Sequence, residues 1–393
     1  MTSFLKLLLT IFVAKQALAF TTPSFHRPLP YSSSSGYSSS SLSSSGASND
    51  EHDILLRCAR GLPTSRTPVW LMRQAGRYQA SFRKFSEKYP FRHRSETTDI
   101  AVSLSLAPLE EFGVDGVVFF SDILTPLPAM GIDFDILPGK GPQISTKIRT
   151  IEDVEKLTPL GDASAKLPFI GEILRKLRDE VKNRSTLIGF VGAPWTLAAY
   201  VIEQKSSKNC AEIKKMQYHQ PEVVEAFIDK IAVMVGEYAC HQIDNGAQII
   251  QIFESWAHHL SPDNFSTWAL PALKTSVQII KKKHPDVPVV FYANGGSSWL
   301  ELQKEVGADM ICLDWKCDMA KAREILGESF PVSGNIDPHV LYGTEDDIRS
   351  AVRENIRNAG GAGNRHLLNL GHGVMKDVSE DAVRWLVDEA KKS

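Results

Sequence analysis

From residue 69 onward the chain alternates short apolar segments, rich in β-branched and aromatic residues, with segments of helical character. Most of the apolar segments are continuous rather than alternating, which is typical of parallel strands covered on both faces. The segments expected to form strands are residues 69–72, 116–120, 186–191, 247–253, 288–292, 310–313, 330–333 and 366–370. Eight strand–helix units in about 340 residues predict a single-domain α/β fold, the (β/α)8 TIM barrel, rather than a doubly wound sheet.

Helix signals lie between the predicted strands. Residues 344–347 have a capping-box pattern ahead of an amphipathic run over 348–359, which stops at the glycines 360 and 361. No GxGxxG follows the first strand and no GxxxxGK[ST] occurs anywhere, so neither nucleotide-binding motif supports the doubly wound alternative. The same helical character is found in residues 297–306, 319–326 and 380–391.

Charge and cysteine content narrow the class of protein. A net charge of −2 gives no global attraction for nucleic acid or an anionic membrane, so any attraction for an acidic ligand must be local. The five cysteines form no recognisable disulfide or zinc framework, and we expect reduced, buried thiols and no metal. They are Cys58, Cys210, Cys240, Cys312 and Cys317.

The N-terminal residues are predicted to lie outside the fold. Lys6 precedes an apolar run over 7–14, and Ala17-Leu18-Ala19 is a small-x-small cleavage pattern, so residues 1–19 are expected to be a signal peptide. Residues 20–50 are rich in serine and poor in acids, which is typical of a disordered transit peptide. The apolar run is too short to span a membrane, so no anchor is expected in the mature form.

This two-part leader resembles those of algae whose plastids lie inside extra membranes. It predicts the plastid (chloroplast) stroma as the destination of residues 51–393, the expected mature domain. Secretion and a cytoplasmic location are the alternatives, and the absence of paired cysteines argues against secretion.

Polar residues follow nearly every predicted strand. In a parallel barrel these positions converge on one mouth, where active sites of this fold lie. In chain order they are Arg73 and Arg77, Asp122, Tyr200, Ser255, Asn294, Asp314, Asn335, Asp337 and His372.

Arg73 and Arg77 are separated by Gly76 directly after the first predicted strand. Two guanidiniums that bind carboxylate or phosphate through a planar fork suggest a pocket for a substrate with several negative groups. A structural ion-pair cluster has the same ingredients, and both interpretations stay open.

The other candidates also have structural alternatives. Asp122, among apolar neighbours, is either a partly desolvated carboxylate or a helix cap. Tyr200 by default is a core aromatic whose hydroxyl reaches a neighbour, and Ser255 is a possible cap for the next element. Glu254 is interpreted as a structural ion-pair partner. His372 lies between glycines, which favours an exposed ring in a loop, although a lone histidine is more often structural.

Two of these segments resemble a known family. The run PVWLMRQAGRY at 68–78 is similar to the N-terminal signature of uroporphyrinogen decarboxylases, and GFVGAPWTLAAY at 189–200 is similar to their second signature. The resemblance extends over residues 52–393. Shorter matches follow in the same order at 120–124, 253–255, 333–337 and 369–373.

The resemblance implies a homodimeric barrel that converts uroporphyrinogen III to coproporphyrinogen III in heme and chlorophyll biosynthesis, without metal or organic cofactor. It implies Asp122 and Arg73 as catalytic residues. The substrate-binding residues that it implies are Arg73, Arg77, Asp122, Tyr200, Ser255 and His372, with Arg94 as a less secure match.

Two other functions compete with this one. Methyltransferases share the barrel, but they hold zinc through a His-x-Cys pair and a distal cysteine, and His372 is followed by Gly373 and Val374. A tetrapyrrole carrier without activity is disfavoured by the presence of both arginines together with Asp122.

Overall fold

The structure is a computed structural model that describes residues 53–72, 76–137 and 139–393. The predicted leader at 1–19 and 20–50 lies outside the described residues, and so does Arg73.

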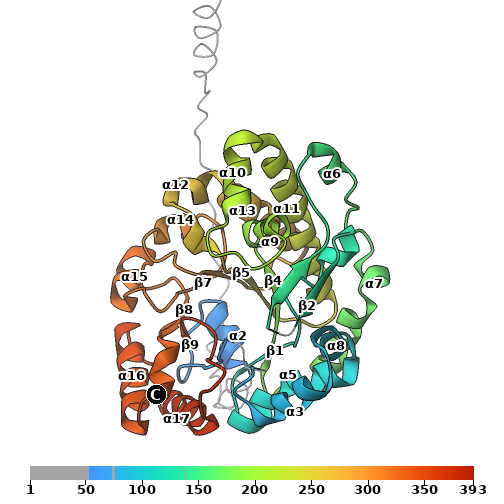
Figure 1. The fold of residues 1–393 in the computed structure, drawn as a ribbon. Helices are drawn as coiled ribbons and strands as arrows, with labels where there is room; N and C mark the ends of the chain where they lie inside the picture. The colour runs from blue at the N-terminus through green and yellow to red at the C-terminus, as the bar shows by residue number, and fades with distance from the viewer. Residues whose placement is uncertain (1–52, 73–75, 138) are drawn as a thin grey trace, which may run out of the picture. The chain divides into compact units, whose positions relative to one another are not determined.

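A parallel sheet curls around the centre of the fold, and helices surround it (Figure 1). Its seven strands in the described part of the chain follow one another in sequence order, and every neighbouring pair is parallel. This arrangement confirms the predicted α/β barrel architecture. The strands are β1 (Gly116–Val118), β4 (Thr186–Gly192), β5 (Ile249–Glu254), β6 (Val289–Ala293), β7 (Met310–Cys312), β8 (Val332–Ile336) and β9 (His366–Leu370).

The first predicted strand, 69–72, is not a strand; the gap between β9 and β1 is closed by a single bridge from Val69 to Leu368. Around it, Trp70 N donates to the Leu368 carbonyl at 3.3 Å, and Asp115 N donates to the Val69 carbonyl at 2.8 Å. The buried Asp115 carboxylate accepts from Val69 N at 2.8 Å and pairs with Arg66 at 2.7 Å. A few backbone hydrogen bonds, reinforced by the Asp115 carboxylate, therefore take the place of a strand ladder at the eighth position of the barrel.

Helices pack outside the sheet and on one another, for example α5 on α8, α11 on α13 and α16 on α17. The α-helices are α2 (Ile54–Ala59), α3 (Ala80–Lys88), α4 (Phe91–Glu96), α5 (Thr98–Phe112), α6 (Ile151–Glu155), α7 (Ala163–Lys166), α8 (Pro168–Val181), α9 (Pro194–Glu203), α10 (Ala211–His219), α11 (Pro221–Asp244), α12 (Pro262–Asn264), α13 (Leu270–Lys283), α14 (Leu300–Lys304), α15 (Met319–Leu326), α16 (Glu345–Asn358) and α17 (Glu380–Lys391). Four further turns are η1 (Leu127–Met130), η2 (Ala257–His259), η3 (Phe265–Ala269) and η4 (Pro338–Tyr342). No helix in the described ranges has the length and apolar character of a membrane span.

Several predicted elements have the expected boundaries, and others differ. The capping box of α16 forms between Thr344 and Asp347 as predicted. The helix predicted at 297–306 is reduced to α14, and the strand predicted at 116–120 is reduced to β1. The long connection after β1 contains an antiparallel hairpin of β2 (Phe134–Leu137) and β3 (Gly141–Ile144), which the sequence patterns do not predict.

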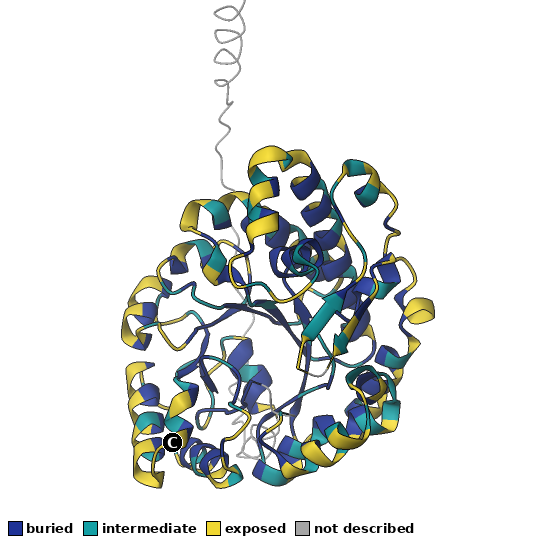
Figure 2. Ribbon diagram, viewed as in Figure 1, coloured by how far each residue is buried: buried dark blue, intermediate teal, exposed yellow. Residues whose placement is uncertain are grey.

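The short helix α2 lies inside the ring of strands (Figure 1). Its apolar side chains join one cluster with Trp70 and with strand residues such as Ile188. A Cβ on Gly116 would come within 2.8 Å of Leu55 Cδ1, so the glycine leaves room for the helix. The strands around it are largely buried (Figure 2), so the side chains of α2 and of these strands form a packed core.

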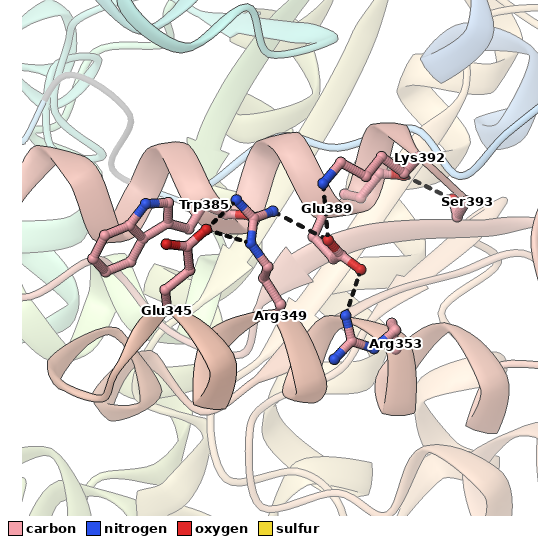
Figure 3. Close-up of polar contacts among 8 residues, drawn as sticks. Glu345, Arg349, Arg353, Trp385, Glu389, Lys392 and Ser393 are labelled. Atoms are coloured by element: carbon pink, nitrogen blue, oxygen red, sulfur yellow. Dashed lines mark hydrogen bonds and ion pairs between the residues drawn. The ribbon is translucent and has the colours of Figure 1, made fainter.

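Helices α16 and α17 are joined by a cluster of charges centred on Glu389 (Figure 3). The Glu389 carboxylate accepts from Arg353 at 2.7 Å, Arg349 at 3.1 Å and Lys392 at 3.4 Å. Burial alone would raise the pKa of Glu389, but hydrogen bonds from Arg353, Arg349 and Lys392 outweigh it and lower the pKa below its usual range. The cluster fastens the last helix to its neighbour.

Candidate active site

The candidate site residues in the described ranges come from segments that follow different strands, and they differ in exposure. Arg77 is exposed. The structure makes Asp122, Tyr200, Ser255 and His372 half-buried, while Arg94 is only 8% exposed.

Asp122 follows β1 and shapes the turn behind it. One carboxylate oxygen, Oδ1, accepts from Leu124 N at 2.9 Å, and Asp122 N donates to Thr125 Oγ1 at 3.2 Å. This is a local side-chain turn of the kind that Asp commonly closes, so the capping interpretation accounts for part of its role. Asp122 is half-buried, so solvent reaches it only in part.

Arg94, in α4, lies in an aromatic enclosure beside Asp122's segment. Its guanidinium carbon is 5.0 Å from the ring centroid of Phe82, 5.6 Å from Phe91 and 5.7 Å from Phe120. Nε donates to the Tyr89 carbonyl at 3.1 Å, whereas Nη1 is buried without a hydrogen-bond partner among the described residues. Burial lowers the pKa of Arg94 from its ordinary value. A buried guanidinium with an unused N–H is a strong donor for a carboxylate.

Aromatic rings form a continuous row across the neighbouring strands β1, β4, β5 and β6, beginning just after β1. Ring centroids are 5.2 Å apart for Phe119 and Phe190, 5.9 Å for Phe190 and Phe253, and 5.8 Å for Phe253 and Tyr292. Phe190 and Phe253 remain half-buried, so they leave apolar surface accessible above the packed core. An apolar floor of this kind is typical of small-molecule sites.

Tyr200 and Ser255 lie close together through Trp256. The rings of Tyr200 and Trp256 have centroids 4.0 Å apart, and Ser255 precedes Trp256 directly. Asn294 Nδ2 donates to the Ser255 carbonyl at 3.1 Å and holds this turn to the end of β6. Trp256 is the N-cap residue of η2, and no side chain in the described part of the chain caps this element, so the Ser255 hydroxyl does not have the capping role that the sequence suggested.

His372 follows β9 and is held by its neighbours. Gly371 N donates to the Ile336 carbonyl at 2.8 Å, and the Gly371 carbonyl accepts from the Tyr292 hydroxyl at 3.0 Å. A Cβ on Gly371 would lie 2.1 Å from Trp315 N, so only glycine fits. The glycine therefore permits a close approach of two backbones. His372 lies in a loop as expected, but the residue is half-buried rather than exposed.

Four other polar residues at strand ends have structural partners. Asn335 donates to the carbonyls of Asp314 and Cys317 and accepts from Asn355. The buried Asp314 carboxylate accepts from Gly295 N and Lys316 N. Asp337 accepts from His339 N at the start of η4, and Asn294 holds Ser255. These groups connect the loops of the mouth.

Glu254 is the residue that the sequence interpretation placed wrongly. It is 0% exposed, and no ion pair of Glu254 occurs among the described residues. Its carboxyl accepts a short hydrogen bond from the Thr196 hydroxyl. Burial raises the pKa of Glu254 to about 8, against the lowering effect of the bonds from Thr196. The flanking residues Phe253 and Ser255 carry no signal that Glu254 is buried without a charged partner.

Thiol and metal chemistry find little support in the described ranges. All five cysteines are unpaired, as predicted, and burial raises the pKa of Cys312 to about 12. In these ranges no three His, Cys, Asp or Glu side chains are grouped to hold a metal ion.

Comparisons with known proteins agree with the sequence signatures. The family model described as uroporphyrinogen decarboxylase (URO-D) matches residues 50–393. A uroporphyrinogen decarboxylase of Trichodesmium erythraeum is 52% identical over 339 residues, 86% of this chain and 95% of the relative. One of Synechocystis sp. is 49% identical over 339 residues, 86% of this chain and 96% of the relative.

Among solved structures, a methyltransferase from Methanosarcina mazei aligns with a TM-score of 0.72 over 86% of this chain and 97% of its own. The two are 19% identical, so this likeness shows the fold alone. The family match and the relatives that span nearly the whole barrel settle the family: the chain belongs to the uroporphyrinogen decarboxylases, which are carboxy-lyases.

Proposed function

We propose that the mouth of this barrel binds the peripheral carboxylates of uroporphyrinogen through arginine side chains, while the Asp122 carboxylate accepts hydrogen bonds from the pyrrole N–H groups at the centre of the macrocycle. The family reaction removes carbon dioxide from the four acetate side chains and gives coproporphyrinogen. The single observation that carries the proposal is the half-burial of Asp122, which follows Phe120 by two residues, and the Phe120 ring lies against the buried guanidinium of Arg94.

The substrate is a flexible macrocycle with carboxylates on its periphery. Guanidinium groups bind carboxylates in a planar, bidentate manner. Arg94 offers a buried N–H that has no partner among the described residues, and Arg77 is exposed where an arm can reach it. We assign Arg73, Arg77 and Arg94 to substrate carboxylates, and Tyr200, Ser255 and His372 to further carboxylates on the rim.

The centre of the macrocycle carries pyrrole N–H groups. A single carboxylate is able to accept from several of them, and we assign this role to Asp122. The rings of Phe190 and Phe253 support the proposal because they are half-buried and leave apolar surface for a flat, largely apolar macrocycle, while the buried Phe119 ring packs beside Phe190. Low polarity around the carboxylate also strengthens its interaction with positive charge.

Loss of carbon dioxide from a pyrrole acetate needs an electron sink. Protonation of the ring carbon next to the acetate supplies one, because it converts the pyrrole to a cationic, iminium-like species. The carbon–carboxylate bond then breaks, and its electron pair neutralises the ring and leaves an exocyclic methylene. Protonation of that methylene gives the methyl group, and loss of the proton first added to the ring carbon restores the neutral pyrrole. Asp122 stabilises the transient positive charge by preorganised electrostatics. Arg73 either delivers the first proton or holds the reacting carboxylate, and the weak acidity of a guanidinium favours the second role.

Product analysis tests this function directly. Purified protein incubated with uroporphyrinogen in the presence of a chelator should yield coproporphyrinogen, through intermediates that have lost one carboxyl group at a time. Binding without loss of carboxyl groups would favour a tetrapyrrole carrier instead. Loss of activity in chelator would contradict the cofactor-free mechanism.

We also propose a homodimer in the plastid stroma. The dimer rests on the family resemblance, and sedimentation of the purified protein at several concentrations tests it. The location rests on the composition of residues 1–50, and a fluorescent protein fused behind this leader tests it. Fluorescence in the cytoplasm or the medium would contradict the plastid assignment.

A further inference from the structure

We propose that Thr196 and Glu254 form a positioning pair that sets the places of Ser255 and Tyr200 for substrate binding. The inference rests on the proposed function, which assigns Ser255 and Tyr200 to substrate carboxylates. Thr196 and Glu254 themselves are not assigned any contact with substrate.

The pair joins two elements of the mouth. Glu254 is the last residue of β5, and Thr196 lies in the first turn of α9. The Thr196 hydroxyl donates to the Glu254 carboxyl, and Thr196 Oγ1 in turn accepts from Trp256 N at 3.1 Å. One hydroxyl therefore connects the side chain before Ser255 with the backbone after it.

The same hydroxyl also fixes the tyrosine. Tyr200 lies four residues after Thr196 in α9, on the same face of the helix. Its ring stacks on Trp256 with centroids 4.0 Å apart. Trp256 therefore contacts α9 twice, with its backbone N–H at Thr196 and with its ring at Tyr200.

The backbone of the turn is fixed on its other side by β6. Asn294 N donates to the Glu254 carbonyl at 3.1 Å, and Asn294 Nδ2 donates to the Ser255 carbonyl at 3.1 Å. Ser255 is thus tied to α9 through Glu254 and to β6 through Asn294. Each of the other hydrogen bonds involves a backbone atom, whereas the bond between the Thr196 hydroxyl and the Glu254 carboxyl group involves side chains alone.

Stability by itself gives no reason for a carboxyl group at this position. Glu254 is fully buried, its Oε2 has no hydrogen-bond partner among the described residues, and burial raises its pKa to about 8. An apolar pair of the same size would avoid the desolvation of polar groups. A directional hydrogen bond, in contrast, fixes an orientation that apolar packing leaves loose.

The test uses near-isosteric variants of the purified protein. Thr196→Val keeps the shape and removes the hydroxyl, whereas Glu254→Gln keeps an oxygen that accepts from it. Ser276→Ala is the control, because Ser276 is a fully buried hydroxyl bonded to the Ala232 carbonyl at 2.8 Å on outer helices. KM and kcat for uroporphyrinogen, and the urea midpoint of unfolding, are measured for each variant.

Thr196→Val should raise KM about tenfold with kcat within about twofold, as expected for a lost binding contribution rather than a lost transition-state contact. Glu254→Gln should keep the wild-type KM. Ser276→Ala should lower the urea midpoint without changing KM. In the Ser255→Ala background, Thr196→Val should raise KM less than it does in the wild type, because only the positioning of Tyr200 remains for it to change.

Three results would overturn the inference. One is an unchanged KM in Thr196→Val. Another is a KM increase in the double variant that equals the product of the increases in Thr196→Val and Ser255→Ala. The third is a rise in KM for Glu254→Gln equal to that for Thr196→Val. Each of these leaves the wild-type conversion of uroporphyrinogen intact, whereas failure of the proposed function appears as absence of coproporphyrinogen with wild-type protein.

Discussion

Replacement of Glu389 by glutamine should loosen the last helix pair of the barrel and lower its stability in a pH-dependent manner. Glu389 in α17 is the common partner of Arg349, Arg353 and Lys392 (Figure 3). Glutamine has nearly the same shape but no charge, so the variant isolates the electrostatic contribution.

The exposed fractions of Glu389 and its partners determine how much unfolding free energy Glu389→Gln removes. The Glu389 side chain is 10% exposed and that of Arg349 17%, so this bond is shielded and should contribute about 1.5–2 kcal/mol. The side chains of Arg353 and Lys392 are 58% and 64% exposed, and solvent reduces each of their contributions to a few tenths of a kcal/mol, roughly. Glu389→Gln should therefore cost about 2 kcal/mol of unfolding free energy at neutral pH.

The sign of the pH dependence follows from the lowered pKa of Glu389 in the folded state. The unfolded chain takes up a proton at this carboxyl near its ordinary value of 4.5, before the folded chain does. The stabilisation is therefore complete above that value and is lost as the pH falls through the lower, folded pKa. The difference between wild type and Glu389→Gln should shrink over the same range.

Urea unfolding followed by circular dichroism measures the difference at each pH, from the shift in midpoint and the slope. Glu354→Gln is the matched control, because Glu354 lies on α16 at 63% exposure with a contact of 4.0 Å to Arg357. That control should change stability by less than about 0.5 kcal/mol. A Glu389→Gln difference that equals the control, or that stays constant through acid pH, would refute the reasoning.

Three further substitutions test separate parts of the structure. Arg94→Met should raise KM for uroporphyrinogen at least about tenfold, because it removes a buried charged donor. Arg92, whose side chain is 41% exposed, provides the control, and Arg92→Met should leave KM unchanged. Equal KM values for the two variants in steady-state assays would contradict the role of Arg94. Gly371→Ala places a Cβ 2.1 Å from Trp315 N and should cost about 3 kcal/mol or more in urea unfolding, and a stable variant would refute the close approach. Leu55→Ala removes a fully buried side chain of α2 and should cost about 2–5 kcal/mol, and a loss below 1 kcal/mol, roughly, would mean that α2 does not support the core.

The elements that sequence reasoning finds correctly depend on local patterns. The capping box at Thr344 and Asp347, the bounds of α15 and α17, and the buried run of β4 are all set by residues close together in the chain. Local propensity and periodicity carry that information. The family signatures carry the rest of the fold.

What sequence reasoning misses depends on contacts between distant residues. The segment at 69–72 reads as a strand, yet its ladder is a single bridge to Leu368, about 300 positions away, supported by Asp115 and Arg66. The hairpin of β2 and β3 lies in a connection whose pattern predicts no strand.

The candidate site shows the same division. The barrel topology predicts that residues after the strands lie at one end of the barrel, but it does not predict the role of each residue. Asp314 and Asn335 are occupied by backbone partners. Glu254, interpreted from the sequence as an ion-pair partner, is instead fully buried against Thr196, and burial raises its pKa. Burial without a charged partner has no signature in the residues on either side.

The central claim is that a lone carboxylate balances the charge of the protonated macrocycle, and a single-turnover comparison of wild type and Asp122→Asn measures it. The amide preserves the size of the side chain but carries no negative charge, so loss of the first carbon dioxide should slow about 100-fold or more with the circular dichroism spectrum unchanged. Release of carbon dioxide by Asp122→Asn at the wild-type rate would contradict the account.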